Sequence, residues 1–237
     1  MHRDDDLSIL LSWAYYYDSM ARFSIQHWPD LDGPQFPMPP SICRDVMISP
    51  SRDLDTIDLL AEVSSMISMK PPVSAPKEDI FDYRDHVSLL RGKIRMALKK
   101  RNRTLGNTPG TSIVVELFYI ALSLYLDRGT EDLLDKHPKQ LCEHIDRAFI
   151  IMSRLSSCER QFPLLILGIE ARSDEQKIVF LDLLSRSRSV SSPNPVDQVK
   201  GIVEAIWAQQ SLAEGHLDYM KLLKGVISPI VPLPIFI

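Results

Sequence analysis

The sequence predicts an all-α protein, and three observations support this class. Apolar residues recur at steps of three and four in separate segments, which gathers them on one face of a helix. No segment alternates apolar and polar residues between turn signals, as a half-buried strand does. Prolines cluster at 29–40 and 71–76, between the periodic segments. We therefore expect a single multi-layer domain over 1–237, with about seven to nine helices and an irregular Pro-rich segment near 29–50.

The predicted helices are of two kinds. Amphipathic segments have one apolar face and belong at the surface of the domain, whereas segments that are apolar nearly all round belong in its middle. The amphipathic segments are Leu7–Trp28, Ile80–Leu98, Leu141–Leu155 and Val199–Trp207. The segments that are apolar nearly all round are Ile113–Leu126 and Phe162–Ala171.

Local sequence patterns predict where two helices begin and what conformation the C-terminal tail adopts. Asn194 before Pro195 is typical of an N-cap followed by the first helical position. Ser173 with Gln176 forms a capping-box pattern. The prolines in Ile227–Ile237 exclude a helix, so we expect this apolar tail to dock in extended form.

Composition and charge narrow the function. Apolar residues make up 45% of the chain and charged residues 24%, which is typical of a folded, soluble protein. The 27 basic and 31 acidic residues give a net charge of −4, whereas a domain that binds nucleic acid by itself usually carries a basic excess. The N-terminus is no signal peptide, and no apolar stretch is long enough for a membrane span. We expect an intracellular protein without direct nucleic-acid or membrane binding.

No catalytic or metal-binding motif is recognisable. Cys43, Cys142 and Cys158 are odd in number and lack the CxxC spacing of a zinc site. Cys142 and His144, near His137, would point about 200° apart on a helix and could not share one ion. Phosphate-binding glycine loops and a nucleophile elbow are also absent. We expect neither an enzyme nor a resident cofactor.

Two polar stretches are candidate regulatory sites. The run Lys99, Lys100, Arg101 and Arg103 could serve as a nuclear-import patch, although cations at a helix C-terminus also complement the helix dipole. The loop 185–193 alternates arginine and serine, so Ser187, Ser189 and Ser192 are candidate phosphorylation sites. The alternative is that this stretch is a solvent-exposed connecting loop without a regulatory role.

The first helix is a candidate ligand or partner surface. Trp13, Tyr16, Tyr17 and Phe23 give it more apolar area than one buried face requires. The simpler interpretation is that these aromatic residues belong to the core.

The second half of the chain resembles a known family. "LFYIALSLYLDRG" (117–129) is followed by "QFPLLILGIEARSDEQKIVFLDLL" (161–184), "VKGIVEAIWAQQ" (199–210) and a terminal "PLPIFI" (232–237). These segments resemble the fungal-specific transcription factor domain, the regulatory domain of fungal zinc-cluster transcription factors. "LLSWAYYYDSMARFS" (10–24) resembles the aromatic-rich helix of that family, but the similarity is strongest over 113–237.

The resemblance implies a regulatory or effector domain in the nucleus that acts in transcription by RNA polymerase II. Its partners would be transcriptional co-regulators or a second copy of itself, and a small apolar ligand could also bind. Zinc would belong to a DNA-binding part that is not present here. The alternative is a stand-alone helical ligand-sensing or protein-interaction module with no role in transcription.

Overall fold

The computed structural model describes most of the chain from residue 54 onward. The described residues are 10, 14, 15, 17–21, 23, 24, 27, 54–104, 109–131, 133, 138–158, 160–188, 193–213 and 218–227. Expectations for the segment 29–50 and the tail 228–237 lie outside these residues. So do Trp13, Tyr16, Ser189 and Ser192.

The described part of the chain is helical and contains no strand, which confirms the all-α prediction. From residue 54 on it contains eight helices. They are α2 (Leu54–Ser68), α3 (Lys77–Thr104), α4 (Pro109–Gly129), α5 (Pro138–Arg154), α6 (Gln161–Ile169), α7 (Asp174–Arg188), α8 (Pro193–Leu212) and α9 (Tyr219–Ile227).

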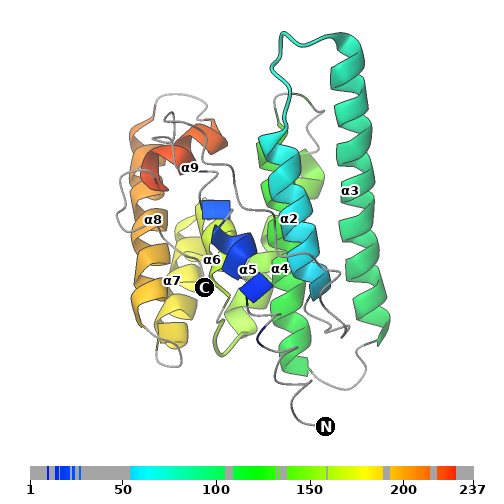
Figure 1. The fold of residues 1–237 in the computed structure, drawn as a ribbon. Coiled ribbons are helices and arrows are strands. Elements are labelled where there is room, and N and C mark those ends of the chain that lie inside the picture. The colour runs from blue at the N-terminus through cyan, green and yellow to red at the C-terminus, as the bar shows by residue number, and fades with distance from the viewer. Residues whose placement is uncertain are drawn as a thin grey trace.

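Helix α4 lies at the centre of the fold. It packs against α2 and α3 on one side and against α5, α6 and α9 on the other. Figure 1 shows α2 and α3 along one edge of the molecule and α7, α8 and α9 along the opposite edge. The arrangement is the multi-layer helical domain that the two all-apolar segments predict, because a helix without a polar face needs neighbours all round.

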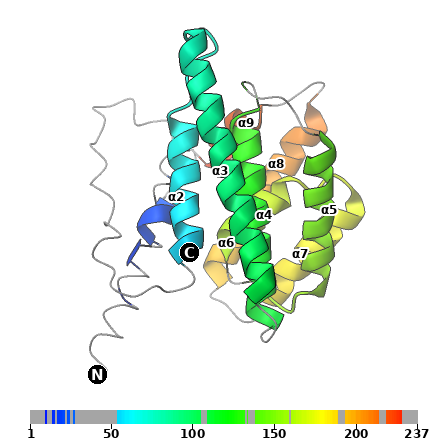
Figure 2. The same ribbon diagram turned by 90° about the vertical axis from the view of Figure 1, so that its right-hand side faces the viewer.

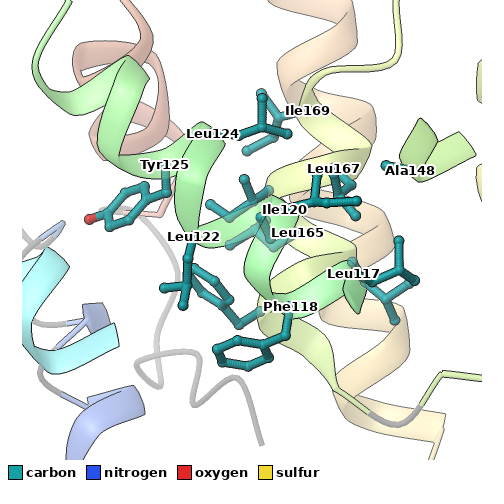
Figure 3. Packing of buried hydrophobic residues seen from close by; sticks show 14 of the residues in the cluster. Leu117, Phe118, Ile120, Leu122, Leu124, Tyr125, Ala148, Leu165, Leu167 and Ile169 are labelled. Carbon is teal, nitrogen blue, oxygen red and sulfur yellow. The ribbon is translucent and has the colours of Figure 1, made fainter. Parts of the chain in front are cut away.

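The two most apolar helices form the core. All nine residues of α6 are buried, and α4 is buried along most of 117–126. Figure 3 shows side chains of the two helices interleaving, with Leu165 and Leu167 of α6 close to Ile120 of α4. Burial of such side chains is the main source of stability in a fold of this kind.

Local interactions explain where two helices begin. The backbone N–H of Gln176 donates to Ser173 Oγ (3.2 Å) and that of Ser173 to Gln176 Oε1 (3.4 Å), which confirms the predicted capping box. Asp218 caps α9 by accepting from the N–H groups of Met220 (2.9 Å) and Lys221 (3.0 Å). Helix α9 is not among the segments predicted from the sequence.

Three predicted boundaries are wrong. Helix α8 begins at Pro193, so Asn194 lies inside its first turn and is not its cap. Helix α7 continues to Arg188, and its last turns contain an i,i+4 ion pair between Asp182 and Arg186 (2.9 Å). Ile227 is the last residue of α9 and is buried, so an extended tail cannot begin there.

None of the helices in the described ranges has both the length and the apolar character that a bilayer span requires.

Candidate functional site

A buried ion pair joins the two central helices. Arg128, at the end of α4, donates from Nε to Glu170 Oε1 (2.8 Å) and from Nη2 to Glu170 Oε2 (2.7 Å). The Glu170 side chain is 0% exposed and that of Arg128 17%. Glu131 Oε2 lies 3.6 Å from Arg128 Nη1, and Arg172 Nη2 lies 3.9 Å from Glu170 Oε2. The bidentate geometry fixes the end of α4 against the end of α6.

Two groups at this site, Arg128 and Tyr219, keep one protonation state near neutral pH. The hydrogen bonds to Glu170 raise the pKa of the Arg128 guanidinium, which therefore stays charged. Burial, and then the negative charge of Glu170, raises the pKa of Tyr219 well above 10. A guanidinium that stays charged beside a phenol that stays protonated suits a structural role better than proton transfer.

A second contact uses the residues that carry the family resemblance. The indole Nε1–H of Trp207 on α8 donates to the backbone oxygen of Gly168 on α6 (2.9 Å). A Cβ added to Gly168 would lie 2.6 Å from the Phe180 ring and 3.0 Å from Val203, so glycine allows α7 and α8 to approach α6 closely. The rings of Phe180 and Trp207 pack edge to face, and Lys177 Nζ lies 5.5 Å from the Trp207 ring centre.

A buried aromatic cluster joins the first helix to the core. The Phe23 ring contacts Tyr125 (ring centres 5.2 Å apart) and Phe162 (5.3 Å) edge to face. His27 Nε2 lies 2.8 Å from the Tyr125 hydroxyl, which Figure 3 shows directed away from the aliphatic side chains of α4. Burial, and then the charge of Lys224, lowers the pKa of His27 from 6.5 to about 3, so the imidazole is neutral at physiological pH.

The predicted aromatic surface is only partly described, and its described members lie against the core. Phe23 is 0% exposed, and Tyr17 is half-buried against the hydrophobic core. Phe23 therefore does not contribute to an open ligand or partner surface, because α4 and α6 cover it.

The structure places Ser187 in a helix and not in the predicted loop. This residue lies in α7 and is 0% exposed. Its Oγ donates to Leu183 O (2.7 Å) and accepts from the N–H of Cys158 (2.8 Å). A serine that contributes two buried hydrogen bonds to the fold is a poor acceptor for a kinase.

The basic run lies at the C-terminal end of α3, where Lys99 and Lys100 are exposed. Arg101 and Arg103 are helical, and their side chains are outside the description. This position fits both the import patch and the complement to the helix dipole.

No group of His, Cys, Asp and Glu within the described ranges could hold a metal ion. Cys142 is exposed and His144 is half-buried on α5, whereas His137 lies outside the description.

Two features were missed in the sequence. The first is the ion pair between Glu170 and Arg128, which are 42 positions apart. The sequence feature that could have indicated it is a charged residue, Arg128, at the end of an otherwise apolar helix. The second feature is an apolar stripe on the outer face of α3, formed by Phe81, Leu89 and Met96. The buried stripe of α3, which includes Val87 and Ile94, has a more regular apolar periodicity, so the outer stripe was not recognised as a separate feature.

These contacts define an all-helical domain whose central polar groups hold helices together. The chain matches the fungal specific transcription factor domain over residues 2–228, and it belongs to this family. It is 31% identical over 235 residues to the transcription factor iacI of Pestalotiopsis fici. That alignment covers 98% of this chain and 59% of the relative, so the chain spans well under two thirds of the curated protein. No solved structure matches the chain.

The match confirms the predicted family. It also extends the similarity to residues 2–112, where the quoted motifs gave less support than in 113–237.

Proposed function

We propose that the chain is the regulatory domain of a nuclear transcription factor, and that it acts in transcription by RNA polymerase II through protein contacts at its surface. The observation that carries this proposal is the family match over 2–228, together with similarity to a transcription factor along 98% of the chain. The proposal assigns no catalytic role and no resident cofactor.

Charge supports regulation without direct DNA contact by this segment. The net charge of −4 provides no general attraction to phosphates. The cations Lys99 and Lys100 are local to the end of α3, which suits recognition by an import receptor.

Among the described residues, the pocket between α7 and α8 is small for a ligand. Its volume is about 180 Å³, whereas pockets for drug-sized ligands measure roughly 300–1,000 Å³. Leu181, Leu184 and Val196 line it, and Arg188 forms an ion pair with Asp197 at its edge (3.2 Å). We propose that the regulatory contacts lie on exposed helix faces.

A reporter assay in a fungal cell tests the proposal. The chain is joined to an unrelated DNA-binding domain, and reporter output is compared with that of the DNA-binding domain alone at equal protein level. A change in output, up or down, is expected. Identical output under every growth condition tested would overturn the regulatory role.

A further inference from the structure

The outer face of α3 changes in charge along its length. The first half of the helix, 77–88, carries both signs, including the cations Lys77 and Arg84 among its acidic residues. In the second half, from Leu89 to Thr104, every charged residue is basic. Figure 2 shows α3 along the front of the molecule, with no other described helix over its outer face. The second half of α3 therefore presents an open cationic surface.

Large apolar side chains lie along the middle of this surface. Leu89 is 67% exposed and Met96 68%. With Gly92 between them, these residues lie within about 60° of one another around the helix, at 100° per residue. The buried stripe of α3, which includes Val87 and Ile94, lies on the opposite side against α2 and α4. Leu89 and Met96 are thus separate from the core.

Cations flank the apolar residues on both sides. At the same 100° step, Arg95 and Lys99 lie on one side of them, and Lys93 and Lys100 lie on the other. All four cations are exposed. Arg95 and Lys99 form no ion pair within the described residues.

Two neighbouring carboxylates are already engaged at the edges of the surface. Glu62 of α2 pairs with Lys93 (2.7 Å), and Asp127 of α4 pairs with Arg91 (2.6 Å). The last carboxylate of α3 itself is Asp85, one turn before Leu89. The surface therefore keeps an excess of positive charge.

Gly92 leaves the α3 backbone accessible at the centre of the surface. Glycine inside a helix is less favourable than alanine, so it usually has a reason in packing. A Cβ added to Gly92 would have no atom within 4 Å, so no contact among the described residues explains the glycine. A close approach by a helix of another molecule would explain it.

We propose that this surface, formed by Leu89, Gly92, Met96 and the four flanking cations, binds an acidic amphipathic helix of a partner protein. Apolar residues of the partner would pack on Leu89 and Met96, which are about 10 Å apart along α3. Its carboxylates would face the cations, so charge complementarity selects an acidic partner. The inference names a kind of partner for the regulatory contacts proposed above, and in that respect it rests on the proposed function.

Two other kinds of polyanion fit the surface less well. A helix that binds a membrane surface buries a broad apolar face in the lipid, whereas the broad apolar face of α3 already packs against α2 and α4. Duplex DNA presents phosphates to cations, but Leu89 and Met96 at the centre of the surface would have no apolar partner there. An amphipathic helix satisfies both the charges and the apolar side chains.

Fluorescence anisotropy with a labelled synthetic peptide tests the proposal. The peptide has about 18 residues, with leucines along one helix face and glutamate and alanine on the others. A control peptide has the same composition, with its leucines distributed around the helix. The purified native chain should bind the first peptide at least roughly tenfold more tightly than the control, and its affinity should fall as salt is added.

Matched substitutions locate the binding surface. Met96→Ser and Lys99→Glu should each weaken binding by roughly tenfold. Ile178→Ser is the control for the first, because Ile178 is 65% exposed on α7, and Lys139→Glu on α5 is the control for the second. Both controls should bind the peptide as the native chain does. Because Met96→Ser leaves every cation in place, its effect separates this surface from the import patch.

A substitution at the glycine tests the close approach of the two helices. Gly92→Gln should weaken binding, since its side chain would occupy the space over the backbone. Gly201→Gln should leave binding unchanged. A Cβ at either glycine meets no atom within 4 Å, so circular dichroism should show native helicity for both variants.

Equal affinity for the two peptides would overturn the proposal, and so would native affinity in Met96→Ser, Lys99→Glu or Gly92→Gln. Tighter binding to a labelled DNA duplex or to vesicles of anionic lipid than to the acidic peptide would also overturn it. The peptide assay measures binding by the purified chain, whereas the reporter assay measures output in a cell. A failure of this inference is therefore distinguishable from a failure of the regulatory role.

Discussion

Breaking the Arg128–Glu170 pair should cost far more stability than breaking a surface pair. Glu170 is 0% exposed, so solvent does not screen it, and Arg128 is 17% exposed. Removing one partner of a buried pair leaves the other charge desolvated, which typically costs about 3–5 kcal/mol.

The two single substitutions should differ in a predictable order. After Glu170→Ala, Arg128 keeps Glu131 at 3.6 Å as a second partner, so we expect a loss near ~3 kcal/mol. After Arg128→Ala, the fully buried Glu170 keeps only the more exposed Arg172 at 3.9 Å among its described cationic neighbours. That substitution should therefore cost more, closer to ~5 kcal/mol.

A double variant separates the charge from the packing. Arg128→Met with Glu170→Leu removes both charges and keeps apolar bulk, so it should be much more stable than either single variant and close to the parent. The surface control is Lys93→Ala, whose pair with Glu62 is 59% and 46% exposed and should cost less than ~1 kcal/mol.

Urea denaturation at pH 7, followed by circular dichroism, gives the free energy of unfolding for each variant. If Glu170→Ala costs no more than Lys93→Ala, or if the double variant is as unstable as the singles, the reasoning about the buried pair is wrong.

Three other predictions use the same measurements or a localisation assay. Gly168→Ala should lower the free energy of unfolding by about 1–3 kcal/mol, because the added carbon would lie 2.6 Å from an aromatic ring. Gly201→Ala, on an open helix face, should raise the free energy of unfolding by up to ~1 kcal/mol. Similar effects at the two sites would contradict the packing argument. Because folded His27 stays neutral down to about pH 3 while the unfolded residue takes up a proton near pH 6.5, its contribution to stability is complete above pH 6.5 and is lost as pH falls toward 3. The free energy of unfolding should fall by up to ~1.4 kcal/mol per pH unit in this window, and between about pH 6 and 5 the slope should be shallower in His27→Gln; equal slopes would show that His27 is not buried neutral. Replacing Lys99 and Lys100 by alanine in a fluorescent fusion should reduce nuclear accumulation of the fusion, with no change in the thermal melting curve. Unchanged nuclear accumulation would show that these lysines are not an import patch and only complement the helix dipole.

The sequence allowed prediction of the features that depend on periodicity. A helix that is apolar all round must be central, so Phe162–Ala171 correctly indicated the buried α6. The capping box at Ser173 was also predictable, because its two residues lie within one helical turn.

Features that depend on tertiary contacts were not predictable in the same way. Ser187 belongs to a stretch with loop-like composition, yet it lies in α7, where its hydroxyl accepts a hydrogen bond from the distant N–H of Cys158. Arg128 and Glu170 are separated by 42 positions, and no spacing rule joins residues so far apart. The outer stripe of α3 is a periodic pattern too, but its significance depends on knowing which face α2 and α4 already cover.

Reporter output from the fused chain and from a core-broken variant, measured together at equal protein level, tests the central claim most directly. Tyr125→Asp places a charge where the side chain is 0% exposed, so it should unfold the domain and return output to that of the DNA-binding domain alone. The intact chain should differ clearly from that baseline. Equal output from the intact and the core-broken fusions would contradict regulation by a folded helical domain.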